Sequence, residues 1–254
     1  MLTLLFDTHL PPPLDLSPVS SFNSPVTYLH LPKEWVQDTA VATATWGDIG
    51  DWDVSEVLDF SHAFSPRVSV GDNPKAATFV GTAISKWITT SAENLYEMFR
   101  EAGEMNADLS GWTVAKVTNL QSTFRGASKF AGTGLESWDT NSVNDLYKTF
   151  NDANAMNVDL GKWSVAKVTR LQQTFQGASK FRGVGLASWN IAKVTEGYMD
   201  KTFTSATSIT SCNKRQIADA WKSNSAFATW NTAWANDACP PLTDASFKQA
   251  SLGT

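Results

Sequence analysis

Large apolar residues recur along this chain at nearly fixed intervals. Six Trp residues are separated by 35, 25, 26, 25 and 26 residues, and they are Trp52, Trp87, Trp112, Trp138, Trp163 and Trp189. A Phe follows the first five after twelve residues and the sixth after fourteen; these are Phe64, Phe99, Phe124, Phe150, Phe175 and Phe203. A fixed period is typical of a tandem array, so we predict six repeats of 25 to 26 residues with these Trp and Phe side chains in a shared core.

Within one repeat, the apolar spacing predicts a short helix followed by a short strand. The helical positions fall at i, i+3, i+4 and i+7, and in one repeat they are Val143, Leu146, Tyr147 and Phe150. The segment 105–110, MNADLS, is short and ends just before the next Trp, so we predict a strand there. The predicted fold class is therefore an α/β repeat solenoid, with one short parallel strand and one short helix per repeat and helical caps at both ends.

Alternate repeats are the most alike. Segment 112–137 matches segment 163–188 at 19 of 26 positions. The core does not dictate the positions that differ, so we predict that they face solvent; the pairs are Asn119 and Arg170, Ser122 and Gln173, Arg125 and Gln176, Ala131 and Arg182, and Thr133 and Val184. Glycines shared by both segments predict a bulge or a close approach of two backbones; they are Gly132, Gly134, Gly183 and Gly185.

The ends of the chain differ from the array. Residues 1–32 hold six of the ten Pro and predict an extended arm, either a loose leader or an arm that docks through Leu2, Leu4, Leu5 and Phe6. Residues 33–50 predict a capping helix, with an amphipathic stretch over 33–46. The solenoid then spans 51–210, with a nine-residue insertion within about 65–78, and 211–254 forms a C-terminal cap whose helix Asn213 can N-cap.

Both cysteines, Cys212 and Cys239, fall in the C-terminal cap. They form either a disulfide or two buried free thiols. A disulfide would stabilise the cap by roughly 3 kcal/mol on the chain-entropy estimate and would indicate an oxidising compartment. We therefore expect the chain outside the cell, at a cell surface or in an oxidising organelle lumen, although the apolar opening MLTLLF lacks the features of a secretory signal.

Composition and charge limit the classes of partner. The net charge of −5 and pI near 5.2 argue against a nucleic-acid partner, which usually demands a basic stripe. No apolar run approaches the roughly 18 to 20 residues of a membrane span. The row Lys116, Lys167 and Lys193 could form a local basic patch, but ordinary solvated lysines are the simpler interpretation.

Candidate chemistry is sparse. The three His residues, His9, His30 and His62, are scattered, and no nucleotide-binding or nucleophile motif occurs, so we predict neither enzymatic activity nor a cofactor. A second set of polar residues recurs before Leu109 and Leu160 and indicates either a cation site or side chains that bond to turn amides; it comprises Asn106, Asp108, Asn157 and Asp159.

The repeated motif also resembles a known family. The segments W-D-V-S-E-V at Trp52 and W-T-V-A-K-V-T-N-L-x-x-T-F at Trp112, followed by F or M-N-x-D-L-S, look like the BspA-like leucine-rich-repeat surface proteins over residues 34–238. This resemblance implies a leucine-rich-repeat-like fold and a surface or adhesive role. It supplies no catalytic residues.

The tandem repeat, the family resemblance and the lack of catalytic motifs together predict a non-enzymatic protein-binding or structural module. It would serve as a surface adhesion module or as a subunit of a larger assembly. The alternative is a glycan- or ice-binding protein that uses an exposed ladder of repeated Trp or Thr side chains, with Thr118, Thr169 and Thr195 as an interrupted Thr row. Candidate contact residues lie in the N-terminal arm, in the insertion 65–75 and at variable repeat positions: Leu2, Leu4, Leu5, Phe6, Arg67, Asp72, Asn73, Lys75, Arg125, Arg170 and Arg182.

Overall fold

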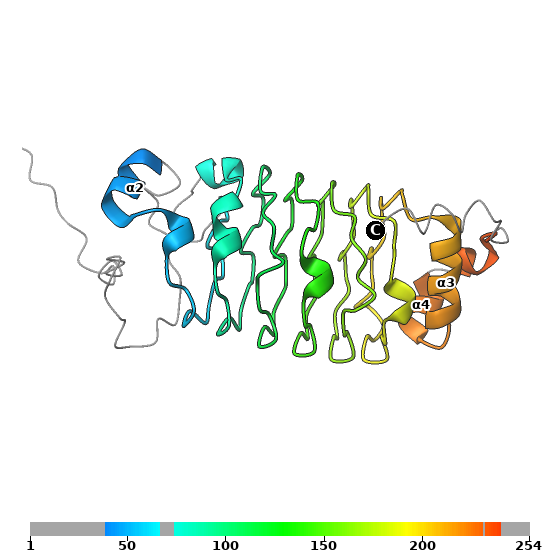
Figure 1. The fold of residues 1–254 in the computed structure, drawn as a ribbon. Helices are drawn as coiled ribbons and strands as arrows, with labels where there is room; N and C mark the ends of the chain where they lie inside the picture. Colours follow the sequence, from blue (N-terminus) through cyan, green and yellow to red (C-terminus); the bar gives the residue numbers. More distant parts are fainter. Residues whose placement is uncertain (1–38, 67–73, 231, 240–254) are drawn as a thin grey trace, which may run out of the picture.

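The computed structural model shows a row of coils stacked along one axis, one coil for each Trp-marked repeat (Figure 1). It describes residues 39–66, 74–230 and 232–239. The α-helices lie outside the coils and are α2 (Thr39–Trp46), α3 (Ser211–Trp221) and α4 (Ser225–Trp230). Short 3-10 helices complete the elements: η1 (Ile49–Asp51), η2 (Pro74–Thr78), η3 (Thr82–Lys86), η4 (Leu135–Ser137), η5 (Leu186–Ser188) and η6 (Thr232–Asn236).

The predicted α/β repeat solenoid, with a strand and a helix in every repeat, is wrong. In the described part of the chain no β-strand forms, and parallel pairing is confined to the isolated bridges Asp59–Asn94, Asn94–Asn119, Asn119–Asp145 and Asp145–Arg170. The segment predicted as a helix over 143–150 is a bridge residue followed by turns, and 105–110 is irregular. The leucine-rich-repeat-like fold implied by the family resemblance is therefore not supported.

Backbone hydrogen bonding explains why neither regular element forms. Along the ladder segment 95–102, alternate amides donate to the next coil, with Leu95 N bonded to Asn119 O and Glu97 N to Gln121 O. Between them, the amides of Met98, Arg100 and Ala102 donate three residues back within the same coil, and Tyr96 N donates to the Asn94 side chain two residues back. Each amide thus has a partner, but half of the bonds are those of a ladder and half are those of turns. The pattern repeats from Leu120, Leu146 and Leu171 in the following coils, in steps of 25 or 26 residues.

Left-handed residues sustain this arrangement. Glu97 and Glu101 have φ of 53° and 59°, and both are the third residue of a turn in which only that position has positive φ, as in a type II turn. The equivalent positions in the next coil are Ser122 and Gly126, with φ of 56° and 71°. A left-handed residue every fourth position excludes a helix, because every residue of a right-handed α-helix needs a negative φ. The turns still bring i, i+3 and i+7 into the core, as at Val143, Leu146 and Phe150, and this is why the sequence resembled that of a helix.

Two columns of aromatic rings fill the interior. The Trp side chains from Trp87 to Trp189 are only 2–4% exposed, and Trp138 stacks on Trp163 with ring centroids 6.1 Å apart. The Phe column runs beside it, with Phe124 and Phe150 stacked at 5.7 Å. Trp52, in the first coil, is half-buried and packs against this core. Because each ring contacts the coil before and after it, a single repeat has no core of its own.

Thr hydroxyls form a third column that the sequence analysis overlooked. Thr123, Thr149, Thr174 and Thr202 precede the core Phe and are buried. Thr149 Oγ1 donates to Leu120 O at 2.9 Å, and Thr202 Oγ1 donates to Leu171 O at 2.7 Å. A buried hydroxyl is tolerated only with a partner, and here the partner is the main chain of the preceding coil. The recurrence of Thr just before Phe was the available signal.

Gly134 and Gly185 mark the close backbone approach expected in the longer repeats. Their φ values are 94° and 85°, and each N-caps a 3-10 helix, η4 or η5. A Cβ at Gly134 would overlap the backbone of Ser110, and a Cβ at Gly185 would overlap that of Gly161. Only glycine fits at these two positions, since both the dihedral angle and the space exclude a side chain.

Helices lie within both predicted caps. The helix expected over 33–46 is described only as α2 from Thr39, and its described side chains, including Val41, are exposed. At the other end α3 begins at Ser211, and its N-cap is Thr210, whose hydroxyl accepts from Asn213 N. The predicted N-cap Asn213 therefore lies inside the helix. Trp221 of α3 stacks on Trp189 at 6.4 Å, so the Trp column extends into this cap.

Candidate partner-binding surface

The exposed positions that vary between coils are the first candidates for a partner-binding surface. Ala131 and Arg182 occupy the same place in coils 112–137 and 163–188, and both are exposed; Thr133 and Val184 form a second exposed pair. The expectation that all such positions face solvent is wrong for Ser122, which is 2% exposed. Its φ of 56° places it in the hydrogen-bonded ladder.

Arg170 is held by its own chain. It stands where the preceding coils carry Asp or Asn, and its Nε donates to Asp145 Oδ2 at 2.9 Å. Its Nη2 donates to Gln121 Oε1 at 2.9 Å, and its guanidinium carbon lies 5.3 Å from the centroid of the Tyr147 ring. Arg125 is held similarly, with Nε donating to Asn151 Oδ1 at 3.3 Å. These two predicted contact residues therefore act mainly in joining coils.

Arg182 is more available. Its side chain is exposed, while its backbone N–H donates to Asn157 Oδ1 and its carbonyl accepts from Asn213 Nδ2. Lys75 lies in η2 and is exposed. The other predicted contact residues, Leu2, Leu4, Leu5, Phe6, Arg67, Asp72 and Asn73, lie outside the described residues.

A charged cluster joins the first two coils. The Glu97 carboxylate is nearly buried, accepts from Arg100 Nη1 at 2.7 Å and lies 3.5 Å from His62 Nδ1. Burial raises the pKa of Tyr96, and the negative charge of Glu97 raises it further. Burial lowers the pKa of Arg100, but the hydrogen bond and charge of Glu97 outweigh this effect and leave that pKa raised. Glu97 and Arg100 form an ion pair within the second coil, and the contact of Glu97 with His62 of the first coil links the two coils.

The recurring Asn and Asp residues serve the backbone. Asn106 Oδ1 accepts from Ala131 N in the next coil, and Asn157 Oδ1 accepts from Arg182 N. Asp108 Oδ1 accepts from Ser110 N, and this bond lowers the pKa of Asp108. Among the described residues, no group of three or more His, Cys, Asp or Glu is placed to hold a metal ion.

The repeated side chains differ in their access to solvent. The indole Nε1 atoms donate to main-chain carbonyls of the preceding coil, as Trp112 does to Ile84 O at 3.0 Å, so these rings are turned inward. Thr118 and Thr169 are exposed, but Asn144 lies between them. Lys116, Lys167 and Lys193 are exposed at the tips of turns on the same edge of the stack.

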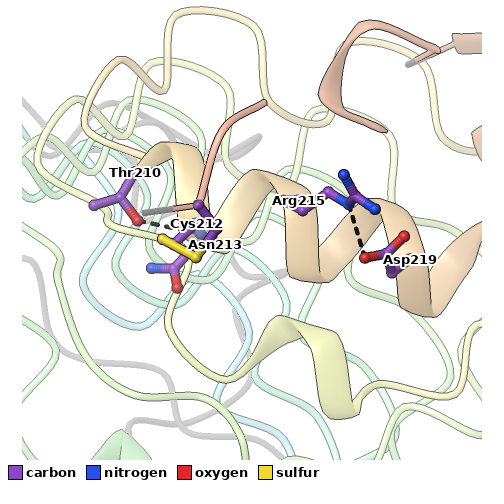
Figure 2. The surroundings of a disulfide bond; sticks show 6 residues. Thr210, Cys212, Asn213, Arg215 and Asp219 are labelled. Atoms are coloured by element: carbon purple, nitrogen blue, oxygen red, sulfur yellow. Dashed lines mark hydrogen bonds and ion pairs between the residues drawn. A yellow bond between two sulfur atoms is a disulfide. The ribbon is translucent and has the colours of Figure 1, made fainter. Parts of the chain in front are cut away.

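A disulfide closes the C-terminal cap. Cys212 at the start of α3 is bonded to Cys239, with the two Cα atoms 4.4 Å apart and a sequence separation of 27 (Figure 2). Nearby, Thr210 caps the helix and Arg215 pairs with Asp219 one turn further along α3. The bond ties the end of the described chain to the helix that covers the last coil.

The family comparison matches most of the chain. Residues 36–134 and 131–239 each match the family described as "Mycoplasma protein of unknown function, DUF285". The chain belongs to this family. DUF285 is associated with BspA-like surface repeat proteins. No curated protein and no solved structure matches the chain.

The two DUF285 matches meet within the coil 112–137. Each match is several times longer than one coil of 25 to 26 residues, so the family model spans more than one coil per copy. No helix in the described part of this DUF285 chain is both long and apolar enough to cross a membrane.

Proposed function

We propose that this DUF285 chain is a non-enzymatic binding module, a rigid repeat scaffold that holds another protein as a surface adhesion module or as a subunit of a larger assembly. The observation that carries the proposal is the contrast between buried and exposed positions in its two most similar coils. Val117 and Val168, Phe124 and Phe175, and Leu135 and Leu186 are identical or alike and fully buried. The exposed pairs Ala131 and Arg182, and Thr133 and Val184, differ in charge or polarity.

This contrast supports recognition of a partner by the exposed side chains. Backbone amides, the Trp, Phe and Thr columns and several charged side chains make the contacts between coils. Side chains outside those columns can change without disturbing the fold, and a scaffold of this kind presents an extended surface. The inward-facing Trp column supports protein binding over stacking of sugars on an exposed Trp ladder.

A surface or luminal location is part of the proposal. The disulfide between Cys212 and Cys239 supports it, because such bonds persist in oxidising compartments. Labelling of intact cells with a membrane-impermeant amine reagent tests the surface version. Recovery of labelled chain supports it, and labelling only after lysis contradicts it.

The partner is tested by affinity capture of the full-length chain from a native extract, followed by mass spectrometry. The informative variant is Arg182→Ala with Val184→Thr, which gives coil 163–188 the exposed residues of coil 112–137. The matched control is Ala131→Arg with Thr133→Val. We expect a stoichiometric partner that the first variant loses and the control keeps. Recovery of the bait alone from all three samples would contradict the proposal.

A further inference from the structure

One edge of the stack carries a row of exposed turns. We define the turn row as residues 53–58, 88–93, 113–118, 139–144, 164–169 and 190–195, the stretch that follows each repeat Trp. In every coil a turn is closed by an amide bonded three residues back, as Val117 N is to Val114 O. Neighbouring members are bonded to one another, with Thr118 N donating to Glu93 O and Asn144 N donating to Thr118 O. The turns therefore lie side by side along the stack (Figure 1).

The charges on the turn row change sign along the stack. The exposed charged residues are Asp53 and Glu56 in the first coil, Glu93 in the second, Lys116 in the third, Asp139 in the fourth, Lys167 in the fifth and Lys193 in the sixth. Within the described residues, none of them forms an ion pair with its own chain. They are therefore available to an external partner.

The whole stack shows the same asymmetry. Residues 52–111 contain nine acidic and four basic residues, a net charge of −5. Residues 163–210, the coils at the other end, contain two acidic and six basic residues, a net charge of +4. The molecule is thus acidic at one end and basic at the other, which favours an antiparallel neighbour of the same charge distribution.

We propose that the turn row is an interface with a second copy of this chain, arranged antiparallel about a two-fold axis between the third and fourth coils. In that arrangement the first coil faces the sixth, the second faces the fifth, and the third faces the fourth. Every facing pair then joins opposite charges: Asp53 and Glu56 with Lys193, Glu93 with Lys167, and Lys116 with Asp139. A two-fold interface requires such self-complementarity, and these three pairings satisfy it.

The side chains between the charges allow close approach. Thr90, Ala115, Asn141, Ala166 and Ala192 at the turns are small. Ile88, which is 61% exposed, lies on the same row and faces the fifth coil, where Ala166 is also exposed. Six coils about 4.8 Å apart give a strip roughly 25 Å long. Because the ends of a turn lie within about 7 Å of one another, the strip with its side chains is about 10 Å wide and covers about 250 Å² per copy.

An interface of that size is below the roughly 800 Å² per partner of a standard complex. We therefore expect a weak dimer that depends on its charge pairs and dissociates in salt, because charges on a solvated surface are screened beyond about 10 Å at 0.1 M ionic strength. This inference goes beyond the proposed function, since it concerns the purified chain alone and holds whether or not a foreign partner binds.

The test is sedimentation equilibrium of the purified full chain at low and high salt. We expect a monomer–dimer equilibrium whose Kd rises at least about tenfold between 20 mM and 500 mM salt. The acidic variant is Lys167→Glu with Lys193→Glu, and the basic variant is Asp53→Lys with Glu56→Lys and Glu93→Lys. Each alone places like charges opposite one another and should be monomeric. Their mixture restores every changed pair and should form a heterodimer.

The matched control is Lys129→Glu with Lys180→Glu, which makes the same charge change at exposed positions outside the turn row. It should dimerise like the parent, and circular dichroism should show the parental fold in all variants. Carbodiimide cross-links between Glu56 and Lys193 would fix the antiparallel direction, because these residues lie five coils apart within one chain.

Three outcomes would overturn the proposal. A parent chain that stays monomeric at low salt would do so, and so would equal dimerisation of the acidic variant with itself and with the basic variant. A monomer that binds heparin through Lys167 and Lys193 would instead identify the basic end of the row as a site for anionic polymers.

Discussion

The indole nitrogen of Trp163 donates a hydrogen bond to the carbonyl oxygen of Leu135, 28 residues earlier, at 2.7 Å. The same bond recurs from Trp87 to Ile49, from Trp138 to Leu109 and from Trp189 to Leu160. Each Trp therefore contributes both a large apolar ring and a buried donor to the coil before it. This combination explains why Trp and not Phe or Leu marks the repeat, since those side chains have no donor.

Replacing Trp163 with Phe should reveal the contribution of that donor. The substitution removes one hydrogen bond and part of a 3%-exposed ring, and we expect a loss of about 2–3 kcal/mol in the free energy of unfolding. Guanidinium denaturation followed by far-UV circular dichroism measures it. The same change at half-buried Trp234 is the control and should cost less than about 1 kcal/mol. Equal losses at both sites would show that the buried donor is unimportant.

Replacing Asp152 with Gly should stabilise the stack. Asp152 has φ of 57°, and the equivalent positions in the neighbouring coils are Gly126 and Gly177. Relief of the left-handed strain outweighs the greater entropy of Gly in the unfolded chain, so we expect a gain of about 0.5–1 kcal/mol in unfolding free energy. The thermal midpoint should rise accordingly. A fall in the midpoint would mean that the Asp152 side chain stabilises the turn more than its backbone strains it.

Replacing Gly185 with Ala should be among the most damaging single changes. The new Cβ would meet both a φ of 85° and the backbone of Gly161. Gly47 is the matched control, because its φ is 78° but no atom lies within 4 Å of an added Cβ. We expect about 1 kcal/mol from Gly47→Ala and at least about 3 kcal/mol from Gly185→Ala. Chemical denaturation of the two variants compares them, and similar costs would rule out backbone contact as the reason for Gly185.

Opening the disulfide should destabilise the C-terminal cap. The bond closes a loop with a sequence separation of 27, and the chain-entropy model gives about 3–4 kcal/mol for a loop of that length. Reductant should therefore lower the denaturation midpoint of the parent chain. It should have no effect on the variant in which Cys212 and Cys239 are both Ser, which should resemble the reduced parent. An unchanged midpoint on reduction would mean that the cap is held by α3 packing alone.

Tyr96 should ionise at higher pH than an ordinary phenol. Burial raises its pKa, and Glu97 adds to the effect. Because the folded-state pKa is the higher one, the stability linked to Tyr96 is fully present below the ordinary value near about 10 and is lost as pH rises through the folded-state pKa. A phenolate absorbance titration of the parent minus that of Tyr96→Phe isolates this residue. Glu97→Gln should bring the titration to lower pH; a titration that does not change would exclude Glu97 as a cause.

The sequence determined which residues recur and which are buried, because packing of one coil on the next selects large apolar side chains at a fixed period. It did not determine the conformation between them. Val143, Leu146, Tyr147 and Phe150 have the spacing of a helical face, but a succession of turns brings only Val143, Leu146 and Phe150 into the core. A non-glycine residue with positive φ, such as Lys148, cannot be recognised from the sequence. The sequence alone therefore could not show that turns form here in place of a helix.

The surface residues, too, could be predicted only in part from the sequence. The sequence identified Arg125, Arg170 and Arg182 as variable, but only the tertiary structure separated the two arginines that join coils from the one that faces solvent, because their partners lie about 25 residues away. It likewise brought together Asp53, Glu93, Lys167 and Lys193 on one edge of the stack. The repeat period follows from local composition and can be read from a list of residues. The hydrogen bonds between coils, which select turns and align the turn row, exist only once the chain has stacked.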